Sequence, residues 1–178
     1  IAPGQNGVGD LTLLGGVVFN GNANFTVEVD GTANAGAGDA DTMVITGDLD
    51  ISNADLVVSE LATADDPEYL IASYTGTLTG TTFASTSGGP AGYGVQIDTT
   101  NQTIKLVEIA VIVTESGSTP STDVTEGGAT DSFTVSLSAF PTSDVSVTIT
   151  PDSDVNLNGA GAGNPIVLTF TSSTGMNA

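Results

Sequence analysis

Acidic side chains are the groups in this sequence best suited to do chemistry, and some recur at a fixed spacing. A Gly-Asp-x-Asp motif occurs twice, nine positions apart, with Asp39 and Asp41 in the first copy and Asp48 and Asp50 in the second. Residues two apart in an extended chain point to the same face, so each copy forms a carboxylate pair. Ca²⁺ prefers such oxygens and takes about six to eight. If stacked strands bring the pairs together they can bind calcium; otherwise they are solvated turn residues.

Other kinds of chemistry are poorly supplied. The chain has no Cys and no His, and Lys105 is its only basic residue. A thiol nucleophile, a histidine base and the commonest transition-metal ligands are therefore missing. The loop residues Asp65, Asp66 and Glu68 could form a carboxylate pair for glycoside chemistry, but that requires a cleft and one raised pKa. We expect no enzymatic activity and interpret this loop as solvated.

The charge of the chain limits its partners. Twenty-one acidic residues and one basic residue give a formal charge of −20. Nucleic-acid phosphates are bound by Lys and Arg, so nucleic acid is excluded as a partner, and an anionic membrane surface is disfavoured. No apolar run approaches the roughly 20 residues that span a bilayer. Divalent cations, cationic polymers and further copies of the chain, with cations screening the repulsion, are the expected partners.

Alternation with a period of two dominates the elements that must position these acids. Phe25, Val27 and Val29 point one way, while Thr26 and Glu28 point the other. Such alternation, with many Thr and Val residues and with Gly, Asn, Asp and Ser between the runs, predicts an all-β protein. The other expected strands are Thr42–Ile45, Tyr69–Tyr74, Gly94–Asp98, Thr103–Val107, Phe133–Leu137, Val145–Ile149 and Ile166–Thr171.

The spacing of the turns divides the chain into two parts. Residues 1–110 have short strands separated by frequent glycines, which predicts a β-solenoid (a parallel β-helix) whose rungs bury one another; a sandwich with tight hairpins is the alternative. Residues 111–122 are interpreted as a linker, because most of them are polar and include Pro and Gly. Residues 123–178 predict a β-sandwich module with too few strands to close, so we expect an incomplete module.

The first part resembles the autotransporter-associated β-helix repeat of large bacterial surface proteins, over about residues 1–108. This resemblance implies the end segment of a β-solenoid. The segments that carry it are Ile1-Ala2-Pro3-Gly4, Gly9-Asp10-Leu11-Thr12-Leu13, the strand from Phe25 to Gly31, the strand from Asp41 to Gly47, Ala54-Asp55-Leu56-Val57-Val58, the strand from Tyr69 to Tyr74, and Gly80-Thr81-Thr82-Phe83.

The second part resembles the Calx-β-like and cadherin-like sandwich modules of bacterial adhesins and matrix proteins. Val124-Thr125-Glu126-Gly127-Gly128 and the two alternating strands that follow it carry the likeness. Modules of this kind bind Ca²⁺ at one end of an Ig-like sandwich, with a Glu near the first strand and acids in the loops. The resemblance therefore implies Glu115, Glu126, Asp152 and Asp154 as calcium ligands.

Together these features predict a non-catalytic structural module of a secreted bacterial surface or extracellular-matrix protein. Exposed strand edges would let it assemble with copies of itself into a filament, sheath or layer, with calcium as a supporting cofactor. A carbohydrate- or surface-binding adhesin module is the alternative, and a polysaccharide-degrading β-helix enzyme is a more distant one. The chain is expected to start after processing or within a longer polypeptide.

Overall fold

A computed structural model describes residues 1–4, 7–21, 23–31, 39–116, 128 and 130–171. Within these ranges the chain forms sixteen strands and no helix, which confirms the predicted all-β class. The strands are β1 (Asp10–Leu14), β2 (Val17–Val18), β3 (Ala23–Asp30), β4 (Thr42–Thr46), β5 (Leu49–Asp50), β6 (Ala54–Ala62), β7 (Glu68–Tyr74), β8 (Leu78–Thr79), β9 (Ser85–Gly88), β10 (Tyr93–Asp98), β11 (Thr103–Glu108), β12 (Val111–Glu115), β13 (Phe133–Leu137), β14 (Phe140–Pro141), β15 (Val145–Ile149) and β16 (Ile166–Phe170).

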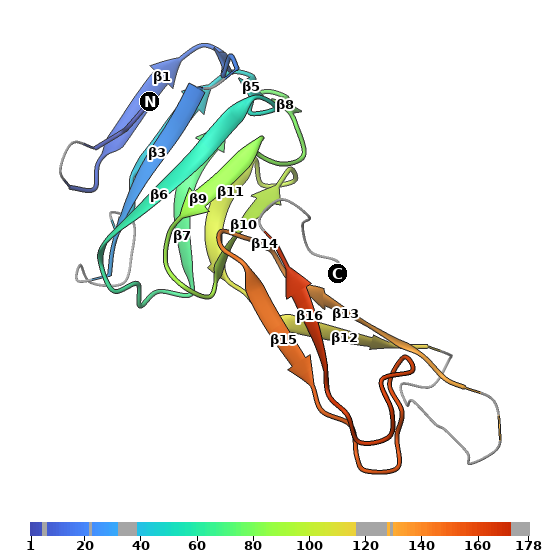
Figure 1. The fold of residues 1–178 in the computed structure, drawn as a ribbon. Helices are drawn as coiled ribbons and strands as arrows, with labels where there is room; N and C mark the ends of the chain where they lie inside the picture. Colours follow the sequence, from blue (N-terminus) through green and yellow to red (C-terminus); the bar gives the residue numbers. More distant parts are fainter. Residues whose placement is uncertain (5–6, 22, 32–38, 117–127, 129, 172–178) are drawn as a thin grey trace.

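The first nine strands repeat one path three times. β1, β4 and β7 pair in parallel, as do β2, β5 and β8, and β3, β6 and β9. Each turn of the chain therefore adds one strand to each of three sheets, and equivalent residues stack, such as Val17 on Leu49 on Leu78. We call β1–β9 the stacked unit (Figure 1).

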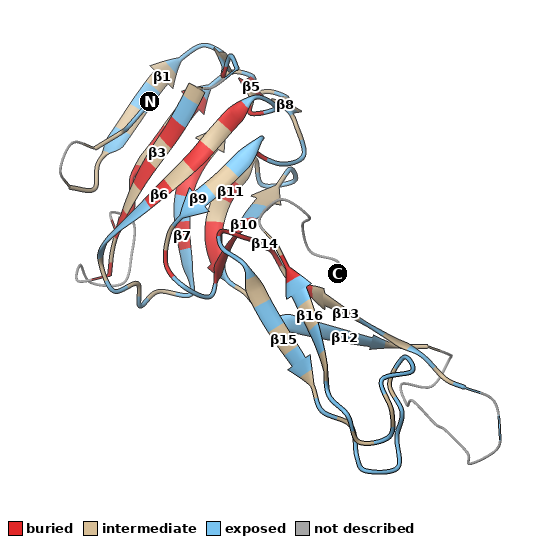
Figure 2. Ribbon diagram, in the orientation of Figure 1, coloured by how far each residue is buried: buried red, intermediate tan, exposed pale blue. Residues whose placement is uncertain are grey.

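The inward residues of the stacked unit form the main hydrophobic core. Phe25, Val27 and Val29 on β3 are fully buried, and β6 places Leu56 and Val58 beside the first two. Alternation on these strands puts every second side chain inside, as Figure 2 shows by the alternating colours of β3 and β6. Burial of branched and aromatic side chains between turns is the main source of stability here.

Close backbone contacts at the corners require glycine. A Cβ on Gly31 would lie 1.8 Å from the carbonyl oxygen of Thr63, in the equivalent turn below it. A Cβ on Gly47 would lie 2.6 Å from the backbone nitrogen of Gly16. No side chain fits at either position, so these glycines allow the turns to stack at the spacing of paired strands.

A hairpin ends the stacked unit on one sheet. β11 pairs antiparallel with the outer edge of β7, and β10 pairs antiparallel with β11. The register of β7 and β11 shifts between Ile104 and Lys105, where Ile71 is the extra residue of a β-bulge. The bulge explains why both Ile71 and Ala72 are buried although they are neighbours in the sequence.

The second part consists of two hairpins, which extend away from the stacked unit (Figure 1). β12 pairs only with β13, and β15 only with β16, among the strands that the structure describes. The short strand β14 pairs with β10 and joins this part to the first sheet. β12 begins at Val111, inside the segment predicted as a linker. The apolar residues from Val111 to Val113 form the first part of its antiparallel ladder with β13.

Candidate functional site

Asp41 has the most completely enclosed carboxylate in the described part of the chain. Its Oδ1 accepts a hydrogen bond from the Gly9 amide at 2.8 Å, and its Oδ2 accepts one from the Glu28 amide at 3.0 Å. Burial raises the pKa of Asp41 above its ordinary value, while the amides of Glu28, Gly9 and Gly4 oppose this shift. The carboxylate thus ties the entry of β1 to strand β3, which is a structural role.

Asp39 is also buried, and it lies three residues before the start of β4. Only 4% of its surface is exposed, and its Oδ2 has no hydrogen-bond partner among the described residues. Its carbonyl oxygen accepts the Asp30 amide at 2.8 Å. A buried carboxylate oxygen normally has a hydrogen-bond partner or a bound ion, so this atom is the strongest sign of a ligand in the motif.

The second acidic pair lies at β5, with Asp48 exposed just before the strand and Asp50 half-buried at its end. Asp48 accepts the Thr77 amide at 2.7 Å and so joins two successive turns of the stacked unit. Asp50 accepts the amide of Ser52 at 2.9 Å and its hydroxyl at 2.6 Å. These two bonds, that of the hydroxyl first, hold the pKa of Asp50 below its usual range.

The two pairs do not stack on one another. Asp39 and Asp41 lie beside β4, in the sheet of β1 and β7, whereas Asp48 and Asp50 lie at β5, in the sheet of β2 and β8. Both motif copies belong to the same turn of the chain, and only residues in successive turns are stacked. The nine-residue spacing therefore carries the second pair onto the next face of the same turn.

The acids predicted in the second module lie at separate places. Glu115 ends β12 and is half-buried, while Asp152 and Asp154 are exposed in the loop that follows β15. The Ser153 hydroxyl donates to the Asp154 carboxylate at 3.3 Å. Glu126 lies outside the described residues. No group of three or more potential metal ligands occurs within the described ranges, so calcium binding at these acids stays a prediction.

The acidic loop before β7 is held by two tyrosines that the sequence analysis did not assign to it. The Tyr69 hydroxyl accepts the amides of Asp65 at 2.9 Å and Asp66 at 3.0 Å, and the Tyr93 hydroxyl donates to the Asp66 carbonyl at 2.5 Å. Glu68 forms an ion pair with Lys105 at 2.7 Å. The loop is thus a fixed surface turn. Its only signal in the sequence is the alternation that places Tyr69 inside, between the exposed Glu68 and Leu70.

Replacing Tyr93 with phenylalanine should lower the free energy of unfolding by about 1–2 kcal/mol at neutral pH, because the Asp66 carbonyl loses its donor. Burial raises the pKa of Tyr93 to about 12, whereas the pKa of a tyrosine in the unfolded chain is about 10. The unfolded state therefore loses this proton first, and stability falls as the pH rises through that interval. Urea unfolding followed by circular dichroism should show a smaller alkaline loss in Tyr93→Phe than in the parent.

Tyr74→Phe is the matched control for that substitution. The Tyr74 hydroxyl is buried and has no hydrogen-bond partner in the part of the chain that the structure describes. Removing it should leave stability at neutral pH unchanged or slightly higher, because no bond is lost. A Tyr93→Phe protein as stable as Tyr74→Phe at neutral pH would contradict a structural role for the bond to Asp66.

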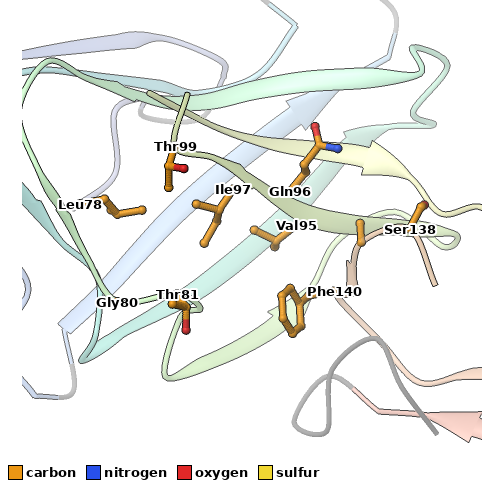
Figure 3. A pocket seen from close by; sticks show the side chains of 10 residues that line it. Leu78, Gly80, Thr81, Val95, Gln96, Ile97, Thr99, Ser138 and Phe140 are labelled. Carbon is orange, nitrogen blue, oxygen red and sulfur yellow. The ribbon is translucent and has the colours of Figure 1, made fainter. Parts of the chain in front are cut away.

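A pocket lies where the end of the stacked unit meets β10 and β14, as Figure 3 shows, with a volume of about 410 Å³. That volume is within the range of small-molecule sites. Its walls are apolar or neutral, and no ionisable side chain lines it. The lining residues are Leu78, Gly80, Thr81, Val95, Gln96, Ile97, Thr99, Ser138, Ala139 and Phe140. Such a pocket can hold a neutral ligand, and its described lining offers Ser and Thr hydroxyls without an acidic or basic side chain beside them.

The described ranges contain no helix, and therefore none long and apolar enough to cross a membrane. Comparison with known proteins gives no match to a family model, to a curated protein or to a solved structure.

Proposed function

We propose that this chain is a non-catalytic structural module of a secreted bacterial surface or extracellular-matrix protein, and that it assembles into a fibre, sheath or layer with the help of cations. In this proposal β1–β9 form the end segment of a β-solenoid of the autotransporter-type repeat. The two hairpins belong to an incomplete sandwich module of the Calx-β-like kind.

One observation carries this proposal. The chain follows the same three-strand path three times, with parallel pairing between equivalent strands. A stack of this kind is built by repetition along one direction, and repeat architectures serve as extended scaffolds and binding surfaces. Among the described strands, β1 at the margin of this stack pairs on one side only, and such an edge can pair with another chain.

The charge of the chain supports a role for cations. A formal charge of −20 makes two copies repel each other strongly at low ionic strength. Salt screens this repulsion, and a divalent cation bound between carboxylates would remove it locally. The exposed acids Asp152 and Asp154 are available for such contacts.

The proposal predicts that assembly depends on calcium. In low salt the purified protein should be dispersed, and CaCl₂ on the order of 10 mM should produce ordered polymers visible by negative-stain electron microscopy. EGTA should dissolve them. NaCl at the same ionic strength is the control, because it separates general screening from bound calcium.

Two results would contradict this prediction in different ways. Polymers that form equally in NaCl and resist EGTA would remove calcium but retain the structural role. A protein that stays monomeric at millimolar concentration under every condition would remove self-assembly itself.

The pocket beside β10 favours the second candidate, a carbohydrate- or surface-binding module. Its Thr81 and Thr99 hydroxyls could hydrogen-bond to a neutral sugar, whereas the Gln96 side chain points to the other face of β10 from Val95 and Ile97 (Figure 3). The three tyrosines are buried, so they offer no stacking platform for such a ligand. Binding on a glycan array that is lost in Thr81→Ala would favour this candidate over the structural one.

A further inference from the structure

Strand β12 is apolar on both faces, yet it lies at the surface. Val111 is 49% exposed, Ile112 43% and Val113 57%, and Figure 2 shows the strand in the exposed colour. Val111 and Val113 share one face with Val135 and Leu137 of β13, while Ile112 points to the other face. The neighbouring β15 instead alternates valine and isoleucine with serine and threonine. Apolar runs on both faces are typical of strands buried within a sheet.

The outer edge of β12 has backbone hydrogen-bonding groups that no described strand uses. The Ser138 amide donates to the Ala110 carbonyl at 2.9 Å, and the Ser116 amide donates to the Ser132 carbonyl at 2.9 Å. Antiparallel ladders alternate, so Ala110, Ile112 and Thr114 face β13, whereas the N–H and C=O groups of Val111 and Val113 point away from it. No strand in the described ranges pairs with this edge.

The edge also lacks the features that prevent pairing. Residues 109–114 contain no charged side chain and no proline, in a chain with 21 acidic residues. By contrast, β1 begins with Asp10, and the edge of β3 is partly covered where the Thr26 amide donates to the Ile1 carbonyl at 2.8 Å. Natural edge strands are normally protected by charge, proline, bulges or covering segments. Two copies of this chain would repel each other least at β12.

We propose that β12 pairs antiparallel with β12 of a second copy, about a twofold axis at Ile112. Val111 of each copy then faces Val113 of the other, which forms about four backbone hydrogen bonds and a continuous sheet β13-β12-β12-β13. The second copy is the occupant that fits, because the strand is uncharged, apolar and complementary to itself in this register. This inference rests on the proposed self-assembly and names the surface that carries it.

The register makes a sharp prediction for cross-linking. At the axis the two Ile112 residues form a non-hydrogen-bonded pair, with Cα atoms about 4.5 Å apart, which suits a disulfide. The chain has no cysteine, so in Ile112→Cys any disulfide joins two copies. Mild oxidation should convert this variant to a covalent dimer on a non-reducing gel. Ser136→Cys, which lies opposite Ile112 on β13, is the control and should remain monomeric.

A proline variant tests the hydrogen bonds without a cross-link. Val113→Pro removes an N–H that points to the open edge and spares the ladder to β13. Sedimentation equilibrium in high salt should show a dissociation constant at least about tenfold higher than that of the parent. Val135→Pro is matched, because Val135 lies opposite Val113 and its N–H points to the far edge of β13. It should dimerise like the parent.

The outcomes separate this inference from the proposed function. A parent that stays monomeric in high salt at all concentrations, or an Ile112→Cys protein that cross-links no faster than Ser136→Cys, overturns the β12 dimer. Polymers that persist in Val113→Pro would leave the structural role standing without this interface. A β12 dimer that never forms polymers would retain the interface and remove the fibre.

Discussion

Replacing Phe25 with alanine is expected to lower the free energy of unfolding by about 3–5 kcal/mol, because it removes a large, fully buried side chain from the core of the stacked unit. The Phe25 ring lies 6.0 Å from that of Phe19 and 6.3 Å from that of Phe83, between centroids. Phe25 itself lies on β3, which is held in a ladder with β6, so the structure around the cavity can relax only in part. Domains have total stabilities of about 5–15 kcal/mol, so this single loss is a large part of the whole.

Tyrosine fluorescence during urea unfolding is the measurement for Phe25→Ala. The chain has no tryptophan, and its three tyrosines lie on β7 and β10, beside the core of the stacked unit. The signal therefore follows this part of the protein and not the two hairpins. A large fall of the midpoint at an unchanged slope is expected.

Phe133→Ala is the matched control. Phe133 is half-buried on β13 and lies outside the main core. Its removal should shift the tyrosine transition much less than the loss of Phe25. Equal shifts for the two variants would contradict a core centred on stacked turns of β3, β6 and β9.

The strands could be predicted from sequence because each depends on a local pattern. The expected strand Thr42–Ile45 is β4 within one residue, and Val145–Ile149 is β15 without change. Alternation places Val27 inside and Thr26 outside whatever the partner strand is. The partner of each strand could not be predicted in this way, because the choice between parallel stacking and hairpins depends on residues far apart in the chain.

The side-chain partners of the acidic residues could not be predicted for the same reason. Asp41 binds the amides of Gly9 and Glu28, which are 32 and 13 residues away in the sequence. Nothing in the local Gly-Asp-x-Asp motif distinguishes this carboxylate from Asp48, whose partner is the Thr77 amide. Only the register of β1 with β4, and the short path from β3 to β4, place Asp41 beside those donors.

The run from Val111 to Val113 lies in the predicted linker, yet the structure places it in strand β12. The polar segment after it contains Pro and Gly, and together with this run it is predicted as a linker over residues 111–122. The structure extends the ladder to Glu115, because β12 has a partner of matching length in β13. A run that is apolar on both faces was itself a signal for a strand with further contacts.

Asp41→Asn is expected to cost about 2–4 kcal/mol of unfolding free energy at neutral pH. The carboxylate accepts amide hydrogen bonds on both oxygens, at 2.8 Å from Gly9 and 3.0 Å from Glu28. An asparagine keeps one accepting oxygen and turns an N–H₂ group toward the other amide, so a buried donor loses its partner. Urea unfolding followed by tyrosine fluorescence measures the loss.

Asp48→Asn is the control, since it also removes one negative charge from an acidic chain. Asp48 is exposed, and its carboxylate accepts the Thr77 amide at the surface. Relief of charge repulsion is common to both variants, whereas the unsatisfied buried amide is specific to Asp41→Asn. Equal stabilities of the two variants would show that the buried carboxylate does not hold the start of β1 to β3.

The pH dependence of the same pair gives an independent test. Burial raises the pKa of Asp41 in the folded state, whereas the pKa of an aspartate in the unfolded chain is about 3.9. Between these two pKa values the folded protein binds the proton more tightly than the unfolded chain does. In this window the Asp41 contribution to stability falls as the pH rises. Asparagine cannot ionise, so the stability lost by Asp41→Asn should be greatest at low pH and should shrink as the pH rises through the window. The same pH dependence in Asp48→Asn would assign the effect to the general charge of the chain and not to the enclosed carboxylate.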